Sequence, residues 1–203
     1  MFDRILRVLK DWLLAPVARA VGPRISPNSI SCLAFAVGMG AAAALLAGRS
    51  GVALGLWLGN RVLDGFDGAQ ARVHGTQSDF GGYLDIVLDF IVYAAIPVAI
   101  AATDATPAIM LAGMVLVASF FVNAASWMYL AAILERRQAG AATRGERTTI
   151  TMPPGVVAGA ETLLFYSLFI AIPAWRLTLF WTMSALVGVN VVQRLWWAHR
   201  ALR

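Results

Sequence analysis

The sequence is poor in charged residues and has almost no cysteine. Asp, Glu, Lys and Arg together make up 13% of the 203 residues, about half the share in a soluble domain, which excludes a soluble enzyme and a disordered chain. The single cysteine, Cys32, allows no disulfide within the chain, and its apolar neighbours predict a small, buried side chain. Hydrophobic residues make up 60% of the chain, against roughly 45–50% in globular domains. This composition is typical of a membrane protein with several spans.

Six apolar stretches, separated by turn signals, predict an all-α fold. A membrane-spanning helix needs about 20 mostly apolar residues, and each stretch is near that length, although three of them carry charges. The longest polar connection covers residues 135–154. We predict one membrane domain over residues 1–203, with six transmembrane helices bundled over 30–197. The expected helices cover residues 30–47, 52–73, 81–103, 107–134, 156–174 and 177–197.

The basic residues predict how this bundle is oriented. The chain has 16 Lys and Arg against 11 Asp and Glu, but the basic residues are dispersed between apolar runs, so we expect no nucleic-acid partner. Basic residues of membrane proteins gather on the cytoplasmic side. All of them except Arg49 and Arg176 fall on one side of the expected topology. We therefore expect both termini to be cytoplasmic and the protein to lie in the inner (cytoplasmic) membrane.

The first 21 residues predict a different element, an amphipathic helix that lies in the cytoplasmic interface. Apolar residues recur there at helical spacing, and charged residues take the opposite face. The alternative is a signal peptide, which the small residues Ala18 and Ala20 favour. Its apolar core would be only Trp12–Ala18, interrupted by Pro16. The apolar positions of the amphipathic pattern are Phe2, Ile5, Leu6, Leu9, Trp12, Leu13 and Val17.

Glycine recurs every four residues on the second expected helix, at Gly51, Gly55 and Gly59. Small residues at this spacing let two membrane helices approach closely. We therefore expect this stripe of glycines to pack against a neighbouring helix rather than to take part in chemistry.

Four aspartates stand out, because charged residues inside membrane spans are expensive and mark functional sites. Asp64 and Asp67 are three residues apart and share one face of the second expected helix. Asp85 and Asp89 are four residues apart and share one face of the third. A short turn joins these helices, so we expect antiparallel neighbours whose carboxylates face one another near the cytoplasmic end.

Four carboxylates in a low-dielectric site repel strongly unless they are protonated or bind cations. Oxygen ligands favour hard ions such as Mg²⁺ or Mn²⁺, and two such ions suit phosphoryl transfer. Gly68 and Ala71 leave room for a phosphate or ribose, and Arg72 offers a planar cationic fork. A proton- or ion-coupled transporter also keeps carboxylates in its spans, and Arg61 could pair with Asp64. From spacing alone, both interpretations stay open.

The same segment resembles the signature of the CDP-alcohol phosphotransferase family of membrane phospholipid synthases. That signature reads D-x2-D-G-x2-A-R-x8-G-x3-D-x3-D, and every fixed position and spacing is present. Residues 26–31 also resemble the Pro-Asn segment with which the family enters its first span, with Ser31 where threonine is common. The matching residues are Asp64, Asp67, Gly68, Ala71, Arg72, Gly81, Asp85 and Asp89.

The resemblance implies a reaction in which an acceptor hydroxyl attacks the β-phosphorus of a CDP-alcohol, usually CDP-diacylglycerol, and CMP leaves. It implies two Mg²⁺ or Mn²⁺ ions per active site, with Asp64 and Asp85 contacting both ions and Asp67 completing the first site. Asp89 would join the second site and act as the catalytic base. We also expect a homodimer surrounded by membrane lipids. The implied donor-nucleotide contacts are Pro27, Asn28, Ser29, Ile30, Gly68, Ala71, Arg72 and Ser78.

Glycerol 3-phosphate is our first choice of acceptor, because a phosphate-bearing alcohol would use the arginines near the expected site. Inositol phosphate, phosphatidylglycerol and serine are the alternatives, and the same arginines would then only orient the protein. Glu161 is an isolated carboxylate in the fifth expected span. It either borders the acceptor pocket or pairs with an arginine of the 135–154 connection. The candidate acceptor-binding arginines are Arg136, Arg137, Arg144, Arg147 and Arg194.

Overall fold

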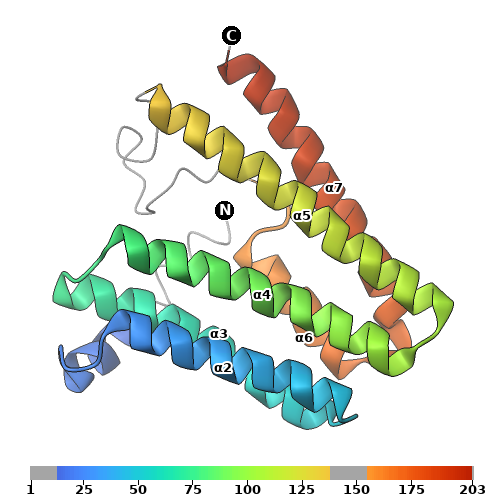
Figure 1. Ribbon diagram of the computed structural model, residues 1–203, viewed down its shortest axis with the longest axis horizontal. Helices are drawn as coiled ribbons and strands as arrows, with labels where there is room; N and C mark the ends of the chain where they lie inside the picture. Colours follow the sequence, from blue (N-terminus) through green and yellow to red (C-terminus); the bar gives the residue numbers. More distant parts are fainter. Residues whose placement is uncertain (1–12, 138–154, 203) are drawn as a thin grey trace.

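The structure, a computed structural model, describes residues 13–137 and 155–202 as a bundle of helices. The predicted all-α fold is confirmed for these two ranges, which contain no strand. Residues 13–21 are helical and precede the bundle, which Figure 1 shows with its helices labelled in chain order. The elements are α2 Pro27–Leu46, α3 Ser50–His74, α4 Asp79–Asp104, α5 Pro107–Arg136, α6 Gly159–Ala171, the 3-10 turn η1 Pro173–Trp175 and α7 Arg176–Ala201.

Every expected helix of the bundle is present, but the fifth is shorter at both ends than the stretch 156–174. At its C-terminal end, Pro173 lacks the backbone N–H that would continue the helix, and the chain enters η1 instead. At its N-terminal end, the segment before α6 is hydrogen-bonded to Asn190 of α7 instead of being helical. Its side-chain oxygen accepts hydrogen bonds from the backbone N–H groups of Val156 and Val157, and its Nδ2 donates to the carbonyl oxygen of Val157 at 2.8 Å.

Within the described residues, four helical segments are long and apolar enough to cross a membrane: α2, α4, α5 and Pro173–Ala201, which joins η1 to α7. α3 has 25 residues but carries the charged side chains of the acidic segment. α6 is apolar but has only 13 residues, or about 20 Å at 1.5 Å per residue. The structure therefore shows an all-helical membrane protein with four candidate spans.

The helices pack as two groups, which are joined by contacts between α4 and α5 and by α6 (Figure 1). α2 packs against both α3 and α4, α5 packs against α7, and α6 contacts α3 and α7. The close approach of α2 depends on Gly38. A Cβ atom at this position would lie 2.8 Å from Cγ2 of Val92 on α4 and 2.9 Å from Nδ2 of Asn60 on α3. A larger residue would therefore push α2 away from both partners.

Of the three glycines in the stripe on α3, Gly59 meets a neighbouring helix, because a Cβ atom there would lie 3.8 Å from Cγ1 of Val37 on α2. Our expectation of close packing was wrong for Gly51 and Gly55, where a Cβ atom would meet no other atom within 4 Å. A four-residue spacing identifies one face of a helix but does not say whether that face meets a helix or the surroundings. Cys32 shows the same limit, because α2 turns it outward beside Leu33 and its side chain is exposed rather than buried.

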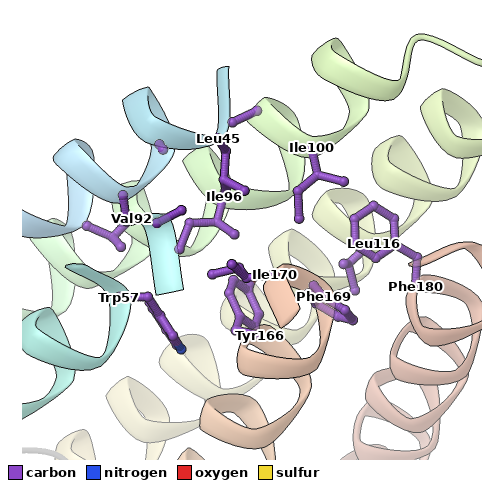
Figure 2. Packing of buried hydrophobic residues seen from close by; sticks show 14 of the residues in the cluster. Leu45, Trp57, Val92, Ile96, Ile100, Leu116, Tyr166, Phe169, Ile170 and Phe180 are labelled. Carbon is purple, nitrogen blue, oxygen red and sulfur yellow. The ribbon is translucent and has the colours of Figure 1, made fainter. Parts of the chain in front are cut away.

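The apolar core extends from Trp57 and Val92, next to the acidic cluster, to the opposite end of the bundle. All six helices of the bundle contribute to it, and Figure 2 shows its largest side chains. Trp57 stacks on Tyr166 with ring centroids 5.2 Å apart, and Phe169 meets Phe180 edge to face at 4.7 Å. These four side chains are fully buried, so the core fixes how α3, α6 and α7 sit against the rest.

The segment before α2 lies against the C-terminal end of α3. Ala18 of the helical residues 13–21 is buried, while Leu13 and Val17 are exposed. His74, at the end of α3, places its Nε2 3.1 Å from the carbonyl oxygen of Ala18. The remainder of the expected amphipathic helix, residues 1–12, lies outside the described residues.

Candidate active site

A short turn brings the two halves of the acidic segment together at one end of the bundle. Gly75 ends α3 in the left-handed conformation (φ 65°), which glycine adopts without strain. Ser78 then begins α4 by accepting a hydrogen bond from the backbone N–H of Gly81 at 3.1 Å. α3 and α4 each pack their backbones against α2. As a result, they meet one another chiefly through long side chains, and the aspartates lie among these.

Asp89 is bound by Arg61, one helical turn before Asp64 on α3. Nη2 of Arg61 lies 2.6 Å from Oδ1 of Asp89, and Nη1 lies 3.3 Å from Oδ2, so the guanidinium contacts both carboxylate oxygens. The distance from Nη1 to Oδ2 of Asp64 is longer, at 3.7 Å. The pairing of Arg61 with Asp64 that the sequence suggested is therefore present, but the closer partner is Asp89 on the neighbouring helix.

The other three aspartates lie near this ion pair. Asp64 interacts with both Asp85 and Asp89. Asp67 is buried against α2, where its Oδ2 accepts a hydrogen bond from the Ser31 hydroxyl at 2.5 Å. The expectation that the two pairs face each other is therefore met by Asp64, Asp85 and Asp89, whereas Asp67 also faces α2.

The donor set fits hard divalent cations. The cluster offers only carboxylate oxygens from these four aspartates, and Arg61 is the cation paired with it through Asp64 and Asp89. A divalent cation would neutralise negative charge on these clustered carboxylates. Across residues 13–137 and 155–202, no three His, Cys, Asp or Glu side chains are already placed as a complete shell for one ion. Binding would therefore require side-chain adjustment.

Two glycines of the signature make room around the site. A Cβ atom at Gly68 would lie 3.0 Å from Nη1 of Arg72, so the Arg72 guanidinium folds over the bare backbone of α3. A Cβ atom at Gly81 would lie 3.1 Å from Oδ1 of Asn28, so this glycine lets the first turns of α2 and α4 approach each other. Asn28 thereby lies beside Gly81 of the signature.

A pocket of about 230 Å³ opens beside these residues. Pro27, Asn28 and Ser78, all expected donor contacts, line it together with side chains that the sequence did not single out. Among the latter, Gln70 is buried and its Nε2 donates to the carbonyl oxygens of Gly22 and Ile25 at 2.7 and 3.1 Å. Gln70 thus ties α3 to the segment before α2. The full lining is Pro23, Ile25, Ser26, Pro27, Asn28, Gln70, His74, Thr76 and Ser78.

The remaining expected donor residues lie near the pocket. Ser29 is in the first turn of α2, where its backbone N–H donates to the Ser26 hydroxyl that caps the helix. Ile30 follows it and is buried. Ala71 lies on the last turns of α3, between Gln70 and Arg72, and its carbonyl oxygen accepts from the N–H of Gly75.

Arg194 is the best-placed of the expected acceptor-binding arginines. It is buried on α7, and its Nη1 donates to the side-chain oxygens of Asn123 at 2.9 Å and Ser126 at 2.6 Å on α5. Its Nε is buried with no hydrogen-bond partner in the described structure. Its hydrogen-bond partners are therefore neutral groups, although the side chain carries a full positive charge.

Three other expected acceptor residues lie at the ends of helices. Arg136 ends α5 and Arg137 follows it, where Nη1 of Arg137 donates to the carbonyl oxygen of Leu202 at 3.0 Å. Arg144 and Arg147 lie outside the described residues. Glu161 is in the first turn of α6, where its Oε2 accepts a hydrogen bond from the backbone N–H of Ala158 at 2.9 Å. Its observed role is to satisfy an N–H group at the helix start.

The fold and the site together define a helical membrane protein whose acidic signature lies beside a polar pocket at one end of the bundle. The family model of CDP-alcohol phosphatidyltransferase matches residues 24–196. The chain therefore belongs to the CDP-alcohol phosphatidyltransferase family, as the signature indicated.

Similar proteins support this assignment. The inner membrane protein YnjF of Escherichia coli (strain K12) is 32% identical over 206 residues, which cover 100% of this chain and 98% of that protein. Two structures of the phosphatidylinositol phosphate synthase PgsA1 of Mycobacterium tuberculosis share the fold at 20% identity. The one with CDP-DAG bound has a TM-score of 0.69 and covers 90% of this chain and 91% of that chain. The one in complex with manganese and citrate has a TM-score of 0.70 and covers 91% and 88%.

Proposed function

We propose that this protein transfers the phosphatidyl group of CDP-diacylglycerol to an alcohol and releases CMP, as a step of phospholipid synthesis. The observation that supports this proposal is the contact between the signature and the start of α2, where the Ser31 hydroxyl donates to Asp67 and Asn28 lies beside Gly81. α3 and α4 hold its acidic residues, and the first turn of α2 supplies the Pro-Asn segment to the same end of the bundle. The CDP-DAG named for the Mycobacterium tuberculosis structure supports this choice of donor.

The pocket is the proposed place of the donor nucleotide. Pro27, Asn28 and Ser78 line it, Ser29, Ile30 and Ala71 lie close to it along the chain, and Gly68 leaves space under the Arg72 guanidinium. A planar guanidinium matches two phosphate oxygens at once. Arg72 would therefore bind the pyrophosphate, while the residues at the start of α2 and α4 would enclose the nucleoside.

The aspartates are proposed to hold two Mg²⁺ or Mn²⁺ ions, which fits the manganese named for the second Mycobacterium tuberculosis structure. Asp64 and Asp85 would bind both ions, Asp67 the first and Asp89 the second. When bound, these ions would neutralise the pyrophosphate charge as CMP leaves. Ser31 holds Asp67 in place through its hydroxyl. Asp89 would accept the proton of the acceptor hydroxyl, since a carboxylate within hydrogen-bond reach is what general base catalysis requires.

The proposed acceptor is glycerol 3-phosphate, with Arg194 as its main phosphate contact. Arg194 is a buried cation whose contacts to Asn123 and Ser126 are neutral, so an anion would supply the missing charge. The further residues that we propose to contact the acceptor are Arg136, Arg144, Arg147 and Glu161. Inositol phosphate offers the same phosphate group, so the acceptor must be chosen by experiment.

In the membrane, we propose a homodimer with six spans and cytoplasmic termini. α3 and α6 would cross together with the four apolar segments, because the core joins all six helices into one bundle. Residues 13–21, with Leu13 and Val17 exposed, would continue an amphipathic helix in the cytoplasmic interface. The active site would then open to the cytoplasm, where soluble acceptors are found.

The test uses purified protein with CDP-diacylglycerol, Mg²⁺ or Mn²⁺ and separate acceptors: glycerol 3-phosphate, inositol phosphate, phosphatidylglycerol and serine. We expect stoichiometric CMP release and a lipid product whose mass identifies the acceptor. Arg194→Gln should raise the KM for a phosphate-bearing acceptor and leave the KM for CDP-diacylglycerol nearly unchanged. Absence of CMP release with every acceptor would contradict the proposed activity, and product with serine alone would contradict the role of Arg194.

A further inference from the structure

Arg61 is not part of the family signature, yet it lies at the centre of the acidic cluster. Its guanidinium contacts both oxygens of Asp89, at 2.6 and 3.3 Å. An arginine fork that meets both oxygens of a carboxylate fixes the plane of that carboxylate as well as its position. The orientation of Asp89 is therefore set by a residue on the neighbouring helix.

Arg61 is itself held firmly. Its Nη1 donates to the Tyr93 hydroxyl at 2.6 Å, and its Nε donates to Oδ1 of Asn60 at 2.7 Å. The guanidinium also lies over the rings of Trp57 and Tyr93, 4.8 and 4.9 Å from their centroids. Asn60 is anchored in turn, because its Nδ2 donates to the carbonyl oxygen of Ala34 on α2 at 2.7 Å. Only about 10% of the Arg61 side chain is exposed.

A second buried arginine shows that this amount of support is unusual. Arg176 of α7 also pairs with an aspartate of α4, Asp104, but through one contact of 3.2 Å, and its Nε donates to the carbonyl oxygen of Phe169 at 2.9 Å. This pair lies at the opposite end of α4 from Asp89, about 22 Å away along the helix axis at 1.5 Å per residue. It joins helix ends and touches no residue of the signature.

We propose that Arg61 is a positioning residue that orients Asp89 for the transfer reaction and weakens the hold of Asp89 on a divalent cation. This inference rests on the proposed function. Its first part follows from the two-oxygen contact with Asp89. Its second part follows from charge, because a fixed cation next to a carboxylate opposes a second cation at the same oxygens.

The test compares Arg61→Met, Arg61→Lys and Asp89→Asn, with Arg176→Met as the matched control. Two quantities are measured: the kinetics of CMP release, and Mn²⁺ binding without substrate, followed by electron paramagnetic resonance. Arg61→Met should lower kcat by about 10–100-fold, the usual effect of losing the partner of a site ligand, while the KM for CDP-diacylglycerol changes little. Its Mn²⁺ midpoint should fall by about tenfold, because one nearby positive charge is gone.

Arg61→Lys keeps the charge but loses the planar fork. Its kcat should lie between those of the parent and Arg61→Met, and its Mn²⁺ midpoint should stay near that of the parent. Arg176→Met should lower the melting temperature and leave kcat and the Mn²⁺ midpoint unchanged. A merely structural role for Arg61 would lower stability but would not tighten Mn²⁺ binding.

The double variant Arg61→Met with Asp89→Asn tests whether Arg61 acts through Asp89. We expect it to be no slower than Asp89→Asn alone and to lose the Mn²⁺ shift, because coupled residues are not additive. It also removes both charges of the pair, so it remains informative if Arg61→Met alone does not fold. Multiplicative losses of kcat, or parent kcat in Arg61→Met, would overturn the inference. If the parent protein releases no CMP, the proposed function fails, while the Mn²⁺ measurements still test Arg61.

Discussion

The two ends of the bundle differ in what lies between the same six helices: apolar side chains at one end and charged side chains at the other. Towards one end, Tyr166, Phe169 and Phe180 belong to a continuous apolar core, which meets the acidic cluster at Trp57 under the Arg61 guanidinium. At the other end, α3 and α4 meet through charged side chains around Asp89 rather than through closely packed backbones. The core end fixes the positions of the helices, so the acidic end can keep unfavourable charges close together. The two ends should therefore respond differently to substitution, in activity at one and in stability at the other.

The largest effect is expected at the acidic end. Asp85→Asn removes a carboxylate that is proposed to bind both metal ions, so we expect CMP release to fall by about 10²–10⁴-fold, the range in which single catalytic groups contribute. Unfolding in detergent should change little, because a neutral amide at position 85 relieves repulsion from Asp67 and Asp89. Chelation of the parent protein should abolish activity, and added Mg²⁺ or Mn²⁺ should restore it. Parent-like activity in excess chelator, with no tightly held metal, would contradict the metal proposal.

The next largest effect is expected at the core end. Phe169→Ala should lower the free energy of unfolding by about 3–5 kcal/mol, the cost of emptying a large buried site, as measured by denaturation in detergent. The KM for CDP-diacylglycerol should stay near that of the parent at a temperature where the variant is folded. Phe121→Ala is the control, because Phe121 is 73% exposed and its loss leaves no cavity. Equal destabilisation by both changes would show that the core does not separate stability from activity.

A smaller effect is expected where the acidic end meets the pocket. Gly68→Leu would displace the Arg72 guanidinium, which lies only 3.0 Å from the position of a Cβ atom at Gly68. Donor affinity should fall by about tenfold or more, as for the loss of one hydrogen bond to a charged group. Calorimetry with a CDP-alcohol measures this change. Gly55→Leu on the same helix is the control and should bind the donor as the parent does, since nothing lies within 4 Å of its Cβ position.

The sequence was enough to predict the positions of the helices and the residues of the signature. Helix length and turn residues mark the bundle, and the spacing of Asp64, Asp67, Asp85 and Asp89 identifies the family. The close pairing of Arg61 with Asp89 was not predictable, because the sequence points to Asp64, the nearest acid along the helix. The observed partner, Asp89, depends on how α2 holds α3 and α4 apart.

Other features depended on contacts that spacing does not encode. Gln70 lies within the signature at a position where any residue is allowed, yet its amide ties α3 to Gly22 and Ile25. Asn190 lies between valines in α7, and it fixes the chain before α6 through Val156 and Val157. Both are buried amides whose partners are backbone groups far away in the sequence, so no local pattern reveals them.

The smallest expected effect is on the free energy of unfolding, and it distinguishes Gly38, which packs against two helices, from Gly55, which packs against none. Gly38→Ala places a methyl group 2.8 Å from Val92 and 2.9 Å from Asn60, so α2 must shift. It should lower the free energy of unfolding by about 1–3 kcal/mol, the usual cost of overpacking. Gly55→Ala adds a methyl group in open space on an exposed helix face. It should raise that free energy by about 0.5–1 kcal/mol, because glycine weakens a helix interior relative to alanine.

The free energy of unfolding should therefore change in opposite directions in the two variants, although both replace glycine by alanine in a helix of the bundle. Gly38→Ala should also lower kcat, because Asn60, which supports Arg61, lies in the path of the new methyl group. Gly55→Ala should leave kcat unchanged. Denaturation in detergent and CMP release measure both quantities for each variant. Destabilisation by Gly55→Ala would mean that this face of α3 meets a partner, such as the second chain of the proposed homodimer.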